Sequence, residues 1–276
     1  MTIRDLLVNL AIGIDDGATV DYAISLARTF DAHLAGVAFA FDVIPPAMLA
    51  GEVPPTWIEE LYKQAQAAAQ AAVERFDAAV KHAGISAEAR WLPGGTADPA
   101  EMFGRVARRF DLSVVGQAEP GKSTPAPLVI EAALFETGRP TLVVPYIQKG
   151  GAKLDRVMLC WDGSRSAARA AGDAIPFLER AGTVEVVIVT EHGESGETPG
   201  ADIAQHLARH GLAVEVKQIV APDAKTADVL LSHAADTSAD LLVLGGFGHS
   251  RLREFILGGV TRSILEAMTV PTLMSH

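Results

Sequence analysis

Short apolar runs alternate with longer amphipathic stretches along the chain, which predicts strands alternating with helices. The runs Asp5–Leu10 and Arg156–Trp161 have the length of buried strands, and an Ala-rich helical stretch follows each of them. Strands that alternate with helices form parallel sheets with right-handed crossovers, so the pattern predicts an α/β protein. Further strand–helix pairs are predicted at Leu34–Phe41 with Trp57–Ala83 and at Val184–Thr190 with Ala201–His210.

The same order of elements occurs twice, which predicts two domains of one kind. Each half closes with a strand-like run ending in glycine, Leu112–Gly116 or Leu241–Gly245, and then a helical segment and a proline-led strand. Between the halves, the polar and glycine-rich segment Tyr146–Leu154 is typical of an exposed linker. The first half alone carries a proline-rich loop, Asp42–Thr56, which we expect to cap a cleft or fill an interface. We place the boundary near Gly150 and the domains at residues 1–147 and 153–276.

Charge and composition narrow the class of protein. A formal net charge of −11 over 276 residues opposes sequence-independent binding to nucleic acid or anionic membranes. No apolar stretch reaches the roughly 20 residues that span a bilayer, and residues 1–5 lack the layout of a signal peptide. The single cysteine, Cys160, lies in an apolar run and rules out a disulfide framework. We predict a cytoplasmic protein without nucleic-acid or membrane partners.

A glycine-rich loop in the second half is the strongest candidate for a ligand site. Gly245–Gly248 follows a predicted strand, nine residues intervene, and Gly258–Thr261 opens a predicted helix. Glycines past a parallel strand let the backbone approach a phosphate, and the N–H groups of a following helix face its negative charge. His249, Ser250 and Arg251 offer further donors. The alternative is that the glycines only shape turns and a helix start.

The segment Trp161–Ser164 strengthens the ligand interpretation. Asp162 comes just past the first strand of the same half, and ligands of open α/β sheets bind outside the carboxyl ends of the strands. Asp162 and the Gly245–Gly259 loop are therefore expected to face one crevice. A carboxylate there can accept a hydrogen bond from an adenine amino group or a ribose hydroxyl. Alternatively, Asp162 caps the helix that starts near Ser164, and both roles can coexist.

On these residues the chain resembles the universal stress protein family in its tandem two-domain form, over essentially its whole length. ATP-binding members of that family carry G-x2-G-x9-G-[ST] before the last helix and Asp-Gly-Ser after the first strand. Gly245, Gly248 and Gly258 match at that spacing, and Asp162–Ser164 matches fully, whereas Gly259 stands where the family has serine or threonine. A hydroxyl donor to phosphate is missing at this position, and Thr261 is expected to substitute in part.

The resemblance implies a fold, a ligand and its contacts. The fold is two tandem doubly wound parallel five-stranded sheets, Rossmann-like and adenine nucleotide alpha hydrolase-like, whose closing strands meet near a pseudo-twofold axis in an internal pseudo-dimer. The ligand is ATP or another adenine nucleotide, with Mg²⁺ accompanying it. Asp162 and the backbone near Val189 would hold adenine and ribose, and Gly248, His249, Arg251 and Gly258 would contact phosphates. The complete candidate set is Asp162, Gly163, Ser164, Val189, Gly245, Gly248, His249, Arg251, Gly258, Gly259, Val260 and Thr261.

The first half is predicted to be a degenerate domain without nucleotide. Alignment of the first strands puts Ala11 opposite Asp162, so the carboxylate is missing. Residues Gly116–Ser123 satisfy the P-loop pattern G-x4-G-K-[ST], but Pro127 lies where the helix of a P-loop should already have begun. We therefore expect this half to serve as a scaffold.

The predicted function is an adenine-nucleotide-binding stress-response or signalling protein. No residue is assigned a catalytic or metal-binding role, and the pair His206 and His210 at helical spacing is interpreted as part of a helix end. A homodimer is expected on top of the internal pseudo-dimer. Two alternatives stay open: a slow Mg-dependent ATPase that uses the same crevice, and a nucleotide-free protein-interaction module in which Gly259 marks a lost site.

Overall fold

Strands and helices alternate along the chain in the order that the hydrophobic pattern predicts. The computed structural model describes residues 2–12, 16–41, 54–95, 99–122, 124–192, 200–246 and 259–276. The first half contains β1 (Asp5–Asn9), α1 (Gly17–Phe30), β2 (His33–Phe41), α2 (Pro55–Ala83), β3 (Ala87–Gly95), α3 (Pro99–Ala107), β4 (Leu112–Gly116), α4 (Ala126–Phe135) and β5 (Thr141–Val144). The second half contains β6 (Arg156–Cys160), α5 (Arg165–Leu178), β7 (Thr183–Thr190), α6 (Ala201–Arg209), β8 (Val214–Val220), α7 (Thr226–Asp236), β9 (Leu241–Gly245), α8 (Gly259–Ala267) and β10 (Thr272–Ser275).

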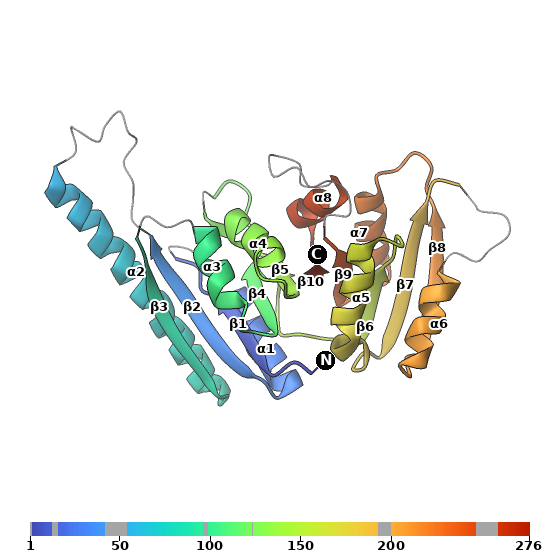
Figure 1. Ribbon diagram of the computed structural model, residues 1–276, viewed down its shortest axis with the longest axis horizontal. Coiled ribbons are helices and arrows are strands. Elements are labelled where there is room, and N and C mark those ends of the chain that lie inside the picture. Colours follow the sequence, from blue (N-terminus) through green and yellow to red (C-terminus); the bar gives the residue numbers. More distant parts are fainter. Residues whose placement is uncertain are drawn as a thin grey trace.

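The two halves share one sheet of ten strands, in the order β3-β2-β1-β4-β5-β10-β9-β6-β7-β8 (Figure 1). Within each half all neighbours run parallel, and the first strand lies at the centre. The halves meet where β5 and β10 pair antiparallel, with Leu142 opposite Leu273. This confirms the predicted fold, two doubly wound five-stranded units in an internal pseudo-dimer, and shows that one continuous sheet joins them.

Helices cover both faces of the sheet, because its central strands are apolar on both sides. One buried cluster joins the sheet to α1, α2, α5 and α6, and a second cluster joins it to α3, α4, α7 and α8. The closing strands β5 and β10 are buried at every residue, as expected of strands at the centre of a layered α/β protein. In the described part of the chain, no helix is both long enough and apolar enough to cross a membrane.

The third strand of each half, β3 or β8, lies at an outer edge of the sheet. Neither was located by the hydrophobic pattern. Charged and apolar side chains alternate over the first four residues of both, and β8 shows the burial expected of a strand with one covered face. The proline-rich segment Asp42–Thr56 lies mostly outside the described residues, apart from its last three positions.

The internal repeat extends to individual contacts. Asp111 precedes β4 and accepts a hydrogen bond from the backbone N–H of Asp5, the first residue of β1, with 3.2 Å between nitrogen and oxygen. Asp240 precedes β9 and accepts the corresponding bond from Arg156, the first residue of β6, at 2.9 Å. The same carboxylate therefore ties the start of the first strand to the start of the fourth in each half. The domain limits at 1–147 and 153–276 remain predictions.

Candidate functional site

The candidate site lies at the carboxyl ends of β6 and β9, where the order of strands reverses in the second half. These strands are parallel neighbours, with Val157 opposite Leu241 and Leu159 opposite Val243. The helix that follows β6, α5, packs on one face of the sheet, and the helix that follows β9, α8, packs on the other. In open α/β sheets this divergence creates the crevice in which ligands bind.

Asp162 lies at this edge, two residues past the end of β6, and its side chain is exposed. Its Oδ1 atom accepts a hydrogen bond from the backbone N–H of Ser164 at 2.9 Å. Gly163 between them has φ of +74°, a left-handed conformation that favours glycine. Ser164 itself caps α5, because its Oγ accepts from the N–H of Ala167 at 3.1 Å. The cap predicted for Asp162 is thus supplied by Ser164, and Asp162 shapes the turn that precedes it.

The backbone of Val189 faces the same crevice. Val187 accepts a hydrogen bond from the N–H of Trp161 at 2.9 Å, so Val187 bonds toward β6. Thr190 accepts from Ala221 at 2.9 Å and therefore bonds toward β8. Since the bonding direction alternates along a strand, the N–H and C=O of Val189 point to the β6 side, beyond the last residue of β6. The structure thus brings Asp162 and this backbone edge together.

Gly245 ends β9, and its missing side chain is required by packing. A Cβ atom at this position would stand 2.6 Å from the carbonyl carbon of Ser166 and 2.8 Å from the Cα of Ala167, in the first turn of α5. The backbone of β9 therefore approaches α5 more closely than any side chain allows. Gly246 continues the chain past the sheet and donates its N–H to the carbonyl of Ser275 at 2.7 Å.

Gly259, Val260 and Thr261 form the start of α8. Gly259 and Val260 are exposed, and no atom of the described residues lies within 4 Å of a Cβ built on Gly259. Thr261 is 4% exposed. Position 259, rather than 261, is therefore where a hydroxyl would reach solvent. Gly248, His249, Arg251 and Gly258 were also predicted to contact phosphate, and they lie outside the described residues.

Cys160 ends β6 and lies directly beneath this edge. Its side chain is buried, and burial raises the pKa of the thiol to about 12, with a smaller contribution from the negative charge of Asp162. The thiol stays protonated at neutral pH and is a poor nucleophile. This agrees with the buried apolar role expected from its place in an apolar run.

The corresponding edge of the first half is occupied by its own side chains. Asp16 Oδ2 accepts a hydrogen bond from the backbone N–H of Ala11 at 2.9 Å. Arg75, from α2, lies 3.7 Å from Asp16 Oδ1 and donates to the carbonyl of Ala11 at 3.4 Å. Ala11 stands where the second half has Asp162, and the ion pair of Asp16 and Arg75 lies against its backbone. The sequence carried no signal for it, because Arg75 is 64 residues from Ala11.

The helix that follows the GKS run of the first half begins later than the helix of a P-loop does. Helix α4 begins at Ala126, five residues after Gly121. The ammonium group of Lys122 pairs with the carboxylate of Glu119 at 2.6 Å, within the loop itself. A P-loop lysine instead reaches toward phosphates from the start of the helix. The loop is organised around its own charges.

Gln117, in the same loop, connects the two halves. It is 5% exposed, and its side-chain amide donates to the carbonyl of Leu265 at 2.8 Å, in the last turn of α8. Its Oε1 accepts from the backbone N–H of Tyr146 at 3.3 Å. The residue therefore fixes the carboxyl end of the helix whose other end begins at Gly259. Sequence reasoning treated Gln117 only as a variable position of the P-loop pattern.

Two further polar groupings lie away from the crevice. The rings of His206 and His210 meet edge to face with centroids 4.9 Å apart on α6. Glu185 of β7 and His233 of α7 are 3.0 Å apart and mostly buried. Within the described ranges, no group of three or more His, Cys, Asp or Glu side chains is arranged to hold a metal ion.

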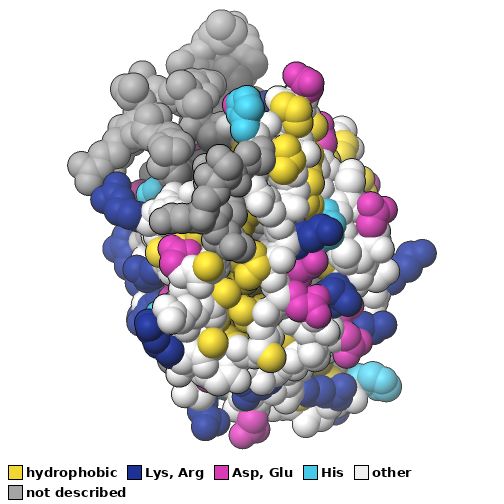
Figure 2. All heavy atoms as spheres, turned by 90° about the vertical axis from the view of Figure 1, so that its right-hand side faces the viewer, with side chains coloured by type: hydrophobic (Ala, Val, Ile, Leu, Met, Phe, Trp, Pro, Cys, Tyr) yellow, Lys and Arg dark blue, Asp and Glu magenta, His cyan; other side chains and the backbone are white. Residues whose placement is uncertain are grey.

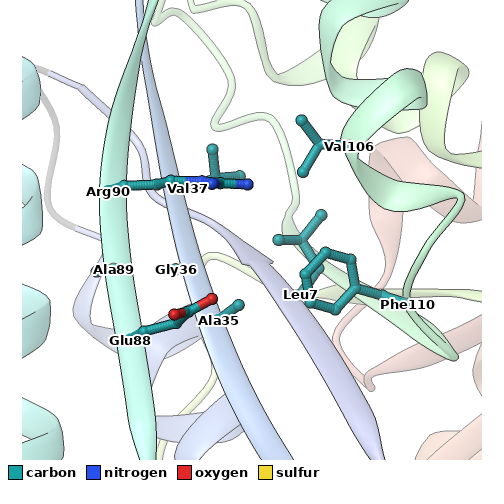
Figure 3. Close-up of a pocket in the computed structure, with 9 residues that line it drawn as sticks. All are labelled: Leu7, Ala35, Gly36, Val37, Glu88, Ala89, Arg90, Val106 and Phe110. Atoms are coloured by element: carbon teal, nitrogen blue, oxygen red, sulfur yellow. The ribbon is translucent and has the colours of Figure 1, made fainter.

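A hollow of about 120 Å³ lies on the first half, on the side of the sheet that faces α3 (Figure 3). When the two halves are compared by strand register, Ala35 of β2 corresponds to Glu185 of β7. The hollow therefore lies where the second half has the side chain of Glu185. Figure 3 shows Glu88 and Arg90 reaching from β3 across the hollow toward Val106 and Phe110. The hollow is therefore distinct from the crevice at the carboxyl ends of β6 and β9. Its lining residues are Leu7, Ala35, Gly36, Val37, Glu88, Ala89, Arg90, Val106 and Phe110.

The fold and the position of the crevice define an α/β protein of the Rossmann-like class, built as a tandem repeat. The model of the universal stress protein family matches residues 153–276, which include β6 to β10 and the whole candidate site. The second half of the chain is therefore similar to the universal stress protein family.

Individual relatives show the same similarity. A universal stress protein from Synechocystis sp. is 26% identical over 176 residues, which cover 59% of this chain and 57% of that protein. The crystal structure of a universal stress protein from Archaeoglobus fulgidus DSM 4304 is similar with a TM-score of 0.67 and 17% identity, over 98% of this chain and 95% of that one. A functionally unknown protein from Pseudomonas aeruginosa PAO1 has a TM-score of 0.61 and 12% identity, over 99% and 92% of the two chains. At these identities, the two structures support the fold alone.

Proposed function

We propose that the second half binds an adenine nucleotide in the crevice at the carboxyl ends of β6 and β9. The observation that carries the proposal is the position of Asp162, an exposed carboxylate at the point where the order of strands reverses, beside the backbone edge of Val189. A purine edge offers both a donor and an acceptor. A carboxylate next to a strand's N–H and C=O groups is complementary to it.

The phosphates would lie at the other end of the crevice. In the proposal, the backbone of Gly245 and Gly246 leads out of β9 toward the phosphate loop, and the N–H groups that open α8 at Gly259 face the negative charge. By the family pattern, Gly248, His249, Arg251 and Gly258 make the remaining contacts. Mg²⁺ would accompany the nucleotide through phosphate oxygens.

The proposed activity is binding, with the ATP-bound and empty states differing in what they present to partners. The first half contributes no second site in this proposal, because Ala11 stands at the position that corresponds to Asp162 and the ion pair of Asp16 and Arg75 lies against its backbone. A structural difference between the bound and empty states would arise in the second half. It would reach the first half through α8, which Gln117 contacts.

Isothermal titration calorimetry with ATP, ADP and AMP, with and without Mg²⁺, tests the proposal. The most informative variant is Asp162→Asn, which keeps an Oδ1 acceptor for Ser164 and replaces the other carboxylate oxygen by an amino group. Hydrogen bonds to charged groups contribute about 1.5–3 kcal/mol, so we expect Kd to rise at least about tenfold. The matched control is Asp223→Asn, an exposed aspartate after β8 at the same edge of the sheet, which removes the same charge.

The outcomes separate the three functions considered. Tight binding that Asp162→Asn weakens and Asp223→Asn does not would support the proposal. Absence of binding at millimolar nucleotide would favour the interaction module and refute it, and equal binding by wild type and Asp162→Asn would refute the assigned site. Release of phosphate above the buffer rate in a single-turnover assay with Mg²⁺ would instead establish the ATPase.

A further inference from the structure

The two outer strands of the sheet, β8 and β3, differ in the backbone N–H and C=O groups that they present to solvent. Among the described strands, β8 has a neighbour on one side only, β7. Ala221 donates its N–H to Thr190 of β7, and the bonding direction alternates along the strand. Residues 215, 217 and 219 therefore bond to β7, whereas residues 214, 216, 218 and 220 present their N–H and C=O groups to the outer edge. This edge can accept another strand.

The row of outward donors on the opposite edge, β3, is interrupted by a proline. Leu34 of β2 donates to Ser86 at 3.4 Å, so residues 86, 88, 90 and 92 bond to β2 and residues 87, 89, 91 and 93 face outward. Pro93 is among the outward residues and has no N–H to offer a further strand. The sequence of β8, VEVKQIV, contains no proline. Of the two edges, β8 is the one with a complete row of outward donors and acceptors.

The charges on β8 match an antiparallel copy of the strand. Glu215 and Lys217 are exposed, lie on the same face and flank Val216, and within the described part of the chain neither forms an ion pair. If two copies pair antiparallel about Val216, Glu215 of each copy lies opposite Lys217 of the other. The twofold symmetry therefore gives two Glu–Lys pairs. A register centred on Lys217 would instead place two lysines opposite each other, which is unfavourable.

We propose that β8 pairs with β8 of a second copy of this chain, antiparallel and centred on Val216, to form a homodimer whose sheet continues across both molecules. The outward residues 214, 216 and 218 would then form the hydrogen-bonded pairs 214–218, 216–216 and 218–214. Val220, 50% exposed, lies at the end of this edge. Figure 2 views the molecule from that side and shows hydrophobic side chains with acidic and basic side chains beside them.

The proposal also explains why assembly would stop at two copies. A twofold contact uses the same surface on both molecules, so both β8 edges are consumed. The edges that remain are the two β3 strands, and there Pro93 interrupts the row of donors. A closed dimer is expected rather than a filament. The dimer is independent of the proposed nucleotide site and should form without ligand.

Sedimentation equilibrium measures the assembly directly. At a chain concentration of about 100 µM, well above a Kd in the micromolar range, we expect a mass twice that of the 29.0 kDa chain. Val216→Pro removes the central outward N–H and should leave a monomer. Its matched control is Ala89→Pro, the corresponding outward position of β3, which should leave the dimer intact. Circular dichroism checks that both variants stay folded.

Charge reversal tests the register without disturbing the fold. Glu215→Lys and Lys217→Glu should each weaken the dimer about tenfold or more, because each places like charges opposite each other at two symmetric positions. An equimolar mixture of the two single variants should dimerise again, since every pair across the edge is then of opposite charge. A wild-type monomer would overturn the proposal. Failure of the mixture to reassociate, or loss of the dimer in Ala89→Pro, would overturn it equally.

Discussion

Gly259 opens α8 at the position where the family pattern carries a hydroxyl, and Gly259→Ser is expected to strengthen nucleotide binding. The residue is exposed, and among the described residues nothing lies within 4 Å of a Cβ built there, so a serine side chain meets no described neighbour. Thr261 is 4% exposed, so its hydroxyl does not lie on the same surface. A serine at 259 would therefore add a donor that the native chain lacks at the phosphate end.

The size of the effect follows from the type of bond. A hydrogen bond to a charged acceptor contributes about 1.5–3 kcal/mol, and the exposure of position 259 favours the lower end of that range. Since 1.4 kcal/mol corresponds to a factor of ten, we expect Kd for ATP to fall about tenfold. AMP should gain less than ATP if the serine contacts an outer phosphate.

Gly259→Ala provides the control. Like Gly259→Ser, it replaces a glycine by a residue that favours the helix, but it adds no hydroxyl. Replacing glycine in a helix by alanine favours the helix by up to about 1 kcal/mol, so both variants should raise the melting temperature. Only the serine should lower Kd in calorimetric titrations. Equal affinities for Gly259→Ser and Gly259→Ala would refute the assignment of this position to the phosphate end.

Two further predictions concern packing. Gly245→Ala should lower the free energy of unfolding in urea by roughly 1–3 kcal/mol or more, because its Cβ would overlap backbone atoms of Ser166. In contrast, Gly172→Ala, within α5 and with open space at its Cβ, should be neutral or stabilising, and a reversed order would contradict the packing argument. Gln117→Leu should cost about 1–3 kcal/mol by leaving the N–H of Tyr146 without its partner, whereas an unchanged urea midpoint would show that the contact with α8 contributes little.

Much of the architecture was predictable because it depends on local patterns. Strands at the centre of a parallel sheet are apolar on both faces, so runs such as Leu241–Gly245 stand out in the sequence. Edge strands are covered on one face, and β8 therefore mixes charged and apolar residues and was not located. The candidate site was predictable for a related reason, since parallel strands place their carboxyl ends at one edge of the sheet.

The alternation of elements, the internal repeat and the positions of Asp162 and Gly245 at the ends of two strands of the same half follow from local sequence patterns. Contacts between segments that are distant in the sequence follow only from the packing of the elements. Arg75 contacts the backbone of Ala11 from 64 positions away, and Gln117 contacts α8 across 148 positions. The pairing register also shows that Pro93 belongs to the outward-facing residues of β3, because the direction of a backbone N–H depends on how the strands pair. Local sequence fixes periodicity, whereas contacts between remote segments depend on how the elements pack.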